Sequence, residues 1–189
     1  MRGTFGPGTL VLGGVALLLL GFLAVGMLLP SQWHAQAERL VAAPPGRVMP
    51  LVDAPEGWLR WTTWPDSGLS RTGPERGVGA SIGWDDPELG SGRFTITDVS
   101  PETRVGYSVE VAGAGGGVMT TVGSISMERE AQGTRIRWSE EGDLGGNPLM
   151  GYFARSMQRL QSTEMQKGLD RLQQLLPSVD PAPDSIEGR

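Results

Sequence analysis

Two carboxylates lie where an apolar pattern expects a core residue. Asp98 follows Phe94 and Ile96 in steps of two, the spacing that brings side chains to one face of a strand. Glu164 comes one turn after Leu160 in a helical pattern. A carboxylate facing a core is costly unless paired, and burial raises its pKa toward a range suited to acid–base catalysis. Both are therefore candidate catalytic groups. The alternative is that Asp98 ends its strand and that Glu164 borders the helix face.

Tyr107 is a third candidate, because a tyrosine hydroxyl in a pocket can donate a hydrogen bond to a carbonyl group. The alternative is a core tyrosine with its hydroxyl at the rim. Nucleophilic catalysis has little support. The chain has no cysteine, and its single histidine, His34, directly follows a long apolar segment. No serine therefore has a well-placed base.

Two further motifs bear on metal and phosphate binding. The stretch "SEEGDLGGNP" groups Glu140, Glu141, Asp143 and Asn147, whose oxygens could hold calcium. It lacks the EF-hand spacing, and we expect a solvated loop between a strand and a helix. The glycine-rich "GAGGGV" at 113–118 lacks the lysine and hydroxyl residue of a phosphate loop and is typical of a hairpin tip. The sequence predicts neither a metal nor a cofactor.

The length and charge of the chain limit its class. The 189 residues suffice for one domain with a sizeable core, and 16 basic against 21 acidic side chains leave a net charge of −5. Nucleic acid binding favours a basic surface, so a nucleic acid partner is not expected.

An apolar segment at 9–30 predicts a single transmembrane helix after a short tail at 1–8. It reads "TLVLGGVALLLLGFLAVGMLL" from residue 9, and no charge occurs between Arg2 and His34. About 20 apolar residues suffice to cross the bilayer. Trp33 suits the interface. The alternative is a signal peptide cleaved near Ala35-Gln36-Ala37, although the segment is longer than the usual signal core. Short N-terminal tails normally stay in the cytoplasm, which predicts an exported domain.

The residues at 33–177 predict one α+β domain. A strand is expected at 33–42, followed by two short proline-started helices, the second bearing Trp58 and Trp61. Five runs of alternating polarity then predict an antiparallel sheet with one packed face. The first places Val78, Ala80, Ile82 and Trp84 together, and the runs occupy 77–86, 92–100, 104–113, 117–130 and 133–143.

A long amphipathic helix begins at Pro148 and can cover the bare face of this sheet. Phe153, Met157 and Leu160 form its first apolar stripe, and Met165, Leu169, Leu172 and Leu176 continue the stripe after a small shift. The proline-rich end at 178–189 predicts a disordered tail. Its last residues, "IEGR" at 186–189, match a protease site used in expression vectors.

The order of elements resembles the helix-grip fold, and three motifs resemble the SRPBCC or START-like (polyketide cyclase/dehydrase-like) superfamily in particular. They read "ERLVAAPPGRVMPLVDAPEGWLRWTTW", "GTRIRWSEEGDLGGNPL" and "MQKGLDRLQQLL", and the resemblance covers about residues 34–176. The fold implied is an antiparallel sheet wrapped on a C-terminal helix, as in START and Bet v 1-like proteins. A membrane helix ahead of such a domain is similar to a known bacterial subgroup.

The resemblance implies a cavity between the sheet and the long helix that binds a hydrophobic small molecule or lipid. Residues on predicted inward faces are the candidate ligand contacts: Trp84, Phe94, Tyr107, Met119, Trp138, Phe153 and Met157. Aromatic rings and methionines suit irregular apolar ligands. The alternative for each is ordinary core packing.

Three tryptophans stand three residues apart in "APEGWLRWTTWPD". We interpret Trp58 and Trp61 as packing on the sheet, and Trp64, before Pro65, as reaching the pocket entrance. Three hypotheses for the function remain. They are a membrane-anchored binding domain for an apolar ligand, a structural or partner-binding domain with a filled core, and a cyclase- or hydrolase-type enzyme acting on an apolar substrate.

Overall fold

The computed structural model describes residues 7–65, 67–87, 90–112 and 117–176. The predicted tail at 178–189 with its "IEGR" ending, most of the N-terminal tail and most of the glycine-rich tip lie outside the described residues. The elements follow one another as α1 (Pro7–Leu28), β1 (Gln32–Val41), α2 (Pro45–Val52), α3 (Pro55–Trp58), β2 (Ser70–Thr72), β3 (Ser81–Asp86), β4 (Gly90–Ser100), β5 (Arg104–Ala112), β6 (Val118–Glu130), β7 (Gly133–Asp143) and α4 (Met150–Gln174).

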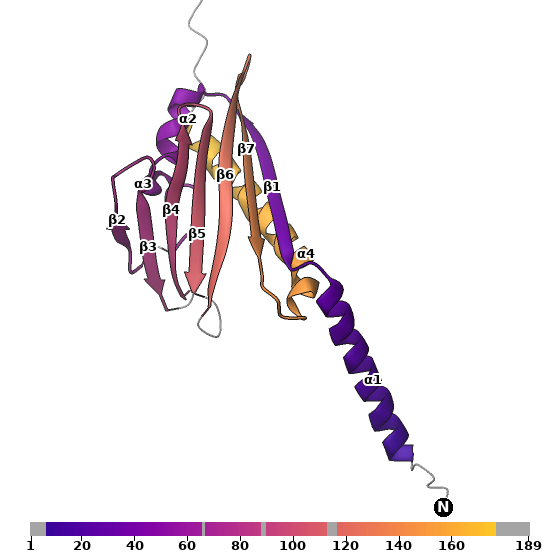
Figure 1. Ribbon diagram of the computed structural model, residues 1–189. Coiled ribbons are helices and arrows are strands. Elements are labelled where there is room, and N and C mark those ends of the chain that lie inside the picture. The colour runs from indigo at the N-terminus through magenta and orange to yellow at the C-terminus, as the bar shows by residue number, and fades with distance from the viewer. Residues whose placement is uncertain (1–6, 66, 88–89, 113–116, 177–189) are drawn as a thin grey trace, which may run out of the picture.

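The seven strands form one antiparallel sheet in the order β1-β7-β6-β5-β4-β3-β2. Strands β2 to β7 form a meander, and β1 closes the far edge by pairing with β7. Helix α4 runs diagonally behind the sheet, and α2 and α3 lie at one end of it (Figure 1). The predicted α+β helix-grip fold is therefore confirmed. The sequence analysis missed β2, whose three residues are all exposed.

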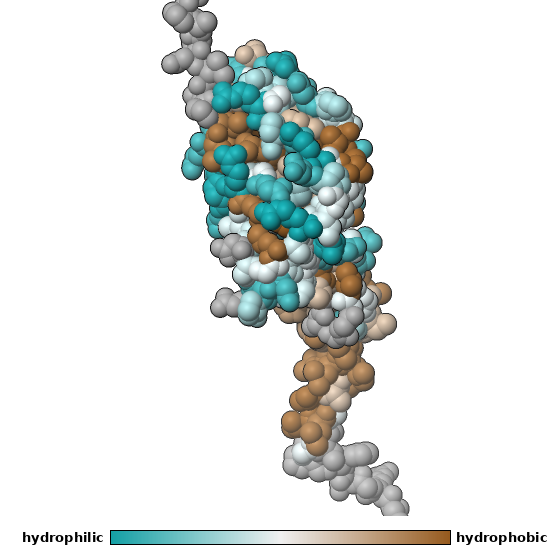
Figure 2. All heavy atoms as spheres, turned by 90° about the vertical axis from the view of Figure 1, so that its left-hand side faces the viewer, coloured by the Kyte–Doolittle hydropathy of each residue, from teal (hydrophilic) through white to brown (hydrophobic). Residues whose placement is uncertain are grey.

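Helix α1 projects away from this two-layer domain (Figure 1). It forms a hydrophobic stalk below a domain whose visible face is mostly hydrophilic (Figure 2). Its stretch Val11–Leu28 is long and apolar enough to cross a membrane, a test that signal sequences also pass.

Three aromatic rings on the inward face of the sheet lie over glycines. The cross-strand pairs are Trp33 with Gly142, Trp84 with Gly92, and Tyr107 with Gly123. A Cβ at each of these glycines would lie within 3 Å of the facing ring. The three glycines therefore allow wide rings to lie close against the sheet. Space then remains for the helices that pack on this face.

Two predicted positions differ in the structure because elements begin or end elsewhere. Helix α3 ends at Trp58, so Trp61 lies in the following turn, where its N–H donates to the Trp58 carbonyl over 3.1 Å. Trp61 is nevertheless fully buried. Val78 precedes β3 between two glycines with positive φ, Gly77 and Gly79, and is 59% exposed rather than inward.

The predicted stripe on α4 is wrong in its first half. Its buried residues are Gly151, Ala154, Met165, Gly168, Leu169 and Leu172. Counting back from Leu172 in steps of 3.6 residues brings Ala154 and Gly151 to the sheet. Phe153 and Leu160 fall outside that line and are 57% and 61% exposed. The tightly packed second half of the helix sets its rotation.

Candidate functional site

A cleft of about 420 Å³ opens between the sheet, the middle of α4 and the chain that follows α3. Residues 62–65 form one wall, and Trp84 and Trp138 form part of the sheet side. The opposite side comes from α4 between Gln161 and Arg171. This volume falls within the range of about 300–1,000 Å³ that ligand pockets occupy.

Trp64 stands at the edge of an aromatic cluster that forms the apolar part of the cleft. Its half-buried ring is stacked on Trp58 with centroids 5.8 Å apart and an interplanar angle of 11°. It lies 4.5 Å from Phe94 and 6.1 Å from Trp84. Trp58 is itself fixed by a 2.7 Å hydrogen bond from its indole N–H to the Val52 carbonyl. The packed cluster therefore holds Trp64 in place while one side of its ring faces the cleft.

The floor of the cleft carries a buried polar network centred on Glu140. The Tyr107 hydroxyl donates to one carboxylate oxygen, and the Gln161 amide donates to the other over 2.5 Å. The indole N–H of Trp138 donates to the Tyr107 hydroxyl over 2.5 Å. Glu140 is 6% exposed and Tyr107 is fully buried. Strands β5 and β7 and helix α4 thus form one hydrogen-bonded network around a single carboxylate.

Burial raises the pKa of Glu140, because a desolvated carboxylate favours its neutral form, and the hydrogen bonds from Tyr107, Gln161 and Trp138 offset only part of this effect. The pKa of Tyr107 is raised well above its usual value, first by burial and then by the neighbouring Glu140. Tyr107 therefore remains a neutral donor, whereas Glu140 is a buried carboxyl group able to exchange a proton.

Gly123 makes this network possible by leaving room for Tyr107. A Cβ at this position would lie 2.2 Å from Cζ and 2.4 Å from the hydroxyl oxygen of Tyr107. No side chain larger than hydrogen fits there unless the ring moves away.

We expect Gly123→Ala to lower the free energy of unfolding by about 1–3 kcal/mol, the usual cost of overpacking a core. The displaced Tyr107 hydroxyl should also lose its bond to Glu140. Chemical denaturation of the full chain in detergent, followed by circular dichroism, measures the loss. Ser124→Ala, on the opposite face of the same strand, is the matched control and should change stability little. Equal stability of both variants would contradict the close fit of Tyr107.

The structure brings together some of the predicted ligand contacts and separates others. Trp64, Trp84 and Trp138 line the cleft. Phe94 and Tyr107 lie fully buried behind them, and Met157 is half-buried against the core.

The inward placement predicted for Phe153 is wrong, and Met119 lies on the predicted face of the sheet but outside the cleft. Phe153 points away because of the rotation of α4. Met119 pairs with Val111 in the inward alternation of β6, but it is 43% exposed at the end of β5 and β6 that α4 does not cover (Figure 1).

The three proton-exchanging candidates also have different outcomes. Asp98 does not share a face with Phe94 and Ile96, because a β-bulge between Ile96 and Asp98 shifts the alternation by one residue. Its half-exposed carboxylate instead pairs with Arg104 over 3.3 Å. Glu164 lines the cleft and pairs with Lys167 over 2.8 Å. Tyr107 is buried in the network of Glu140.

Glu140 is the cleft residue that the sequence analysis missed, because its acidic stretch was interpreted as a solvated loop although the predicted strand at 133–143 includes it. Strand β7 continues to Asp143, so Glu140 still follows the inward alternation of Thr134, Ile136 and Trp138. That alternation was the available signal. Glu141 is exposed on the other face, and Asp143 accepts bonds from Ser31 over 2.5 Å and from the Gly145 N–H over 2.8 Å. Among the described residues, no group of three or more histidine, cysteine or acidic side chains could hold a metal ion.

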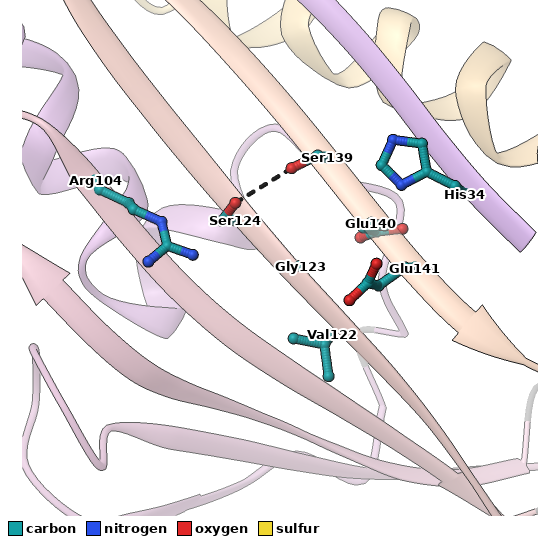
Figure 3. A pocket seen from close by; sticks show the side chains of 8 residues that line it. All are labelled: His34, Arg104, Val122, Gly123, Ser124, Ser139, Glu140 and Glu141. Atoms are coloured by element: carbon teal, nitrogen blue, oxygen red, sulfur yellow. Dashed lines mark hydrogen bonds between the residues drawn. The ribbon is translucent and has the colours of Figure 1, made fainter.

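A second hollow lies on the outer face of the sheet, where β1, β6 and β7 present His34, Ser124 and Ser139 (Figure 3). The two serine hydroxyls are 3.2 Å apart, and either one can be the donor. Within the described residues, no hydrogen bond joins His34 to either serine. The hollow holds about 170 Å³.

An antiparallel sheet wrapped on a long C-terminal helix, with an aromatic cleft between them, defines a helix-grip domain of the START and Bet v 1-like class. The chain belongs to the polyketide cyclase/dehydrase and lipid transport family, whose sequence pattern matches residues 32–177. The predicted resemblance is thereby confirmed.

Solved structures of bacterial proteins share this fold. An uncharacterized protein from Rhizobium leguminosarum is 24% identical, with a TM-score of 0.55 over 77% of this chain and 94% of its own. A protein from Mesorhizobium loti is 16% identical, with a TM-score of 0.57 over 78% of this chain and 99% of its own. A protein from Thermus thermophilus is 21% identical, with a TM-score of 0.56 over 76% of this chain and 96% of its own. No curated protein matches the chain.

Proposed function

We propose that this chain is a membrane-anchored domain that binds a hydrophobic small molecule or lipid in the cleft beside Trp64. The observation that carries the proposal is a cleft of about 420 Å³ whose wall is aromatic and whose floor carries one buried carboxylate. Such a site suits a ligand with an apolar body and one polar group. Membership of a family that includes lipid transport supports the same function.

The proposed anchor is helix α1. Its 22 residues extend about 33 Å at 1.5 Å per residue, which matches a hydrocarbon layer of about 30 Å. Leucines and valines along its length are exposed, as lipid-facing residues should be. The short tail with Arg2 would remain in the cytoplasm, which places the domain on the exported side.

Retention of α1 is favoured over its removal as a signal peptide. The tripeptide Ala35-Gln36-Ala37 lies inside β1, where it pairs with residues 138–140 of β7. Ala35 and Ala37 are buried in the core. Cleavage there would shorten β1, the edge strand that pairs with β7 and contacts α4.

We expect Trp64→Ala to weaken uptake of a fluorescent fatty acid or phospholipid by about tenfold, which corresponds to about 1.4 kcal/mol. The ring supplies apolar contact at the mouth of the cleft, so the lost affinity reflects lost area. Titration of detergent-solubilised full chain measures it, and Val78→Ala, an exposed position away from the cleft, is the control. A wild-type chain with no uptake, and no co-purifying ligand in native mass spectrometry, would contradict the proposal.

A second function, catalysis on an apolar substrate, is favoured by one observation. Glu140 is a buried carboxylate of raised pKa that lies at the floor of a cleft, as acid–base catalysis requires. Glu140→Gln separates the two functions. An enzyme would still take up its substrate but lose turnover, whereas a binding domain would show no conversion of the bound molecule with either residue.

A further inference from the structure

The last turns of α1 pack against the beginning of α4. The rings of Phe22 and Tyr152 are stacked with centroids 4.5 Å apart and an interplanar angle of 4°. The Tyr152 hydroxyl donates to the main-chain carbonyl of Phe22 over 2.7 Å. The two helices approach one another where α1 enters the domain (Figure 1).

Glycine on each helix makes this contact close. A Cβ at Gly26 would lie 2.1 Å from the Pro148 carbonyl oxygen, and one at Gly151 would lie 2.5 Å from the Leu29 Cβ. Both glycines are buried. The backbones of the two helices are therefore in contact, and this contact fixes where the start of α4 lies along the axis of α1.

The contact with α4 lies before the C-terminal end of α1. Phe22 precedes Leu28 by about 9 Å along the helix, at 1.5 Å per residue. The helix is only about 3 Å longer than the hydrocarbon layer, so it cannot slide far enough to lift Phe22 out of the bilayer. Tyr152, which is stacked on Phe22, must then enter the bilayer as well.

The chemistry of this part of α4 suits lipid. No charged residue occurs between Asp143 and Arg155. Leu149 and Phe153 are 39% and 57% exposed. Arg155 is exposed one turn beyond Tyr152, where a cation can reach lipid phosphates.

We propose that residues 148–153, the foot of α4, are immersed in the outer layer of the bilayer that α1 spans. The inference rests on the proposed membrane anchoring. The foot then fixes the domain against the membrane as a second contact, and Arg155 meets the headgroups. The cleft begins at Gln161, which lies about 12 Å beyond Phe153 along α4 at 1.5 Å per residue. A lipid ligand must therefore leave the bilayer to enter it.

Depth-dependent fluorescence quenching tests the proposal, and the absence of cysteine makes single-site labelling clean. Phe153→Cys, Leu23→Cys and Gln132→Cys variants of the full chain each receive an environment-sensitive dye. They are placed in nanodiscs of phosphatidylcholine and phosphatidylglycerol, with and without phospholipid that carries a nitroxide on the upper acyl chain. Leu23 lies in α1, and exposed Gln132 lies in the β6–β7 turn at the far end of the sheet.

We expect the nitroxide lipid to quench the dye at Phe153 and at Leu23 but not at Gln132. Quenching at Leu23 alone would overturn the immersed foot while leaving the anchor intact. No quenching at Leu23 would overturn the anchor and the foot together. Shielding of Phe153 from water without nitroxide quenching would also overturn the proposal, because it would indicate that a second copy of the chain covers this surface.

Discussion

Replacing Trp61 with alanine should lower the free energy of unfolding by about 3–5 kcal/mol, the usual cost of truncating a buried aromatic residue. Trp61 is fully buried, with its ring 4.6 Å from Trp58 and 5.1 Å from Trp138. Its indole N–H donates to the Leu51 carbonyl over 2.9 Å. Alanine would leave a cavity and an unpaired carbonyl at once. Chemical denaturation of the full chain in detergent, monitored by circular dichroism, measures the loss.

Trp64→Ala is the matched control for this prediction, because it removes the same side chain three residues later. Its ring is half-buried and makes no such main-chain bond among the described residues. It should cost clearly less stability while weakening ligand uptake. Equal losses in the two variants would show that Trp64 belongs to the core and would remove it from the ligand site.

Replacing Glu140 with glutamine should raise stability at neutral pH and flatten its pH dependence. Because burial raises the folded-state pKa of Glu140, the folded chain holds its proton at pH values where the unfolded chain has released it. The wild type is therefore more stable at acidic pH and loses stability as the pH rises from the unfolded pKa to the folded one. Each pH unit of that window is worth about 1.4 kcal/mol. Glutamine still accepts from Tyr107, and the Gln161 amide can turn to present its oxygen.

The measurement is the difference in free energy of unfolding between wild type and Glu140→Gln. It is taken from pH 4, near the ordinary pKa of a carboxyl group, up to pH 8. This difference removes contributions shared by both chains, such as that of Glu38, whose pKa is lowered chiefly by a hydrogen bond from Arg135. Glu141→Gln, on the exposed face of the same strand, is the matched control for the removal of one acidic charge. A wild type that gains stability relative to Glu140→Gln as the pH rises would contradict a raised pKa.

Most of the architecture was predictable from local patterns. Alternating polarity identified five strands because one face of an antiparallel sheet is packed and the other is solvated. The prolines at the first positions of α2 and α3 marked helix starts, because the first N–H groups of a helix have no partner within it. Strand β2 escaped prediction because all of its residues are exposed and carry no alternation.

The errors at the site share one cause, which is that long-range packing sets which way a side chain faces. A bulge beside Ile96 turned Asp98 outward, and the rotation of α4 exposed Phe153. Glu140 was grouped with a solvated loop because of its acidic neighbours, although it lay within the predicted strand at 133–143, and β7 pairs with β1 as far as Asp143. The carboxylate of Glu140 can face inward because Tyr107 and Gln161, which are far from it in the chain, donate hydrogen bonds to it.

The sequence by itself determined the α+β class, the apolar N-terminal helix and the inward positions of Trp84 and Trp138, because these depend on composition and on periods of two or 3.6 residues. The cavity and the position of Trp64 at its entrance were implied by the resemblance to START-like proteins. Only the tertiary structure decided that Glu140 is the buried acid of the cleft and that Tyr152 lies against Phe22. Those contacts join residues far apart in the chain. They depend on glycines such as Gly123 and Gly26, whose missing side chains have meaning only once a neighbour occupies the space.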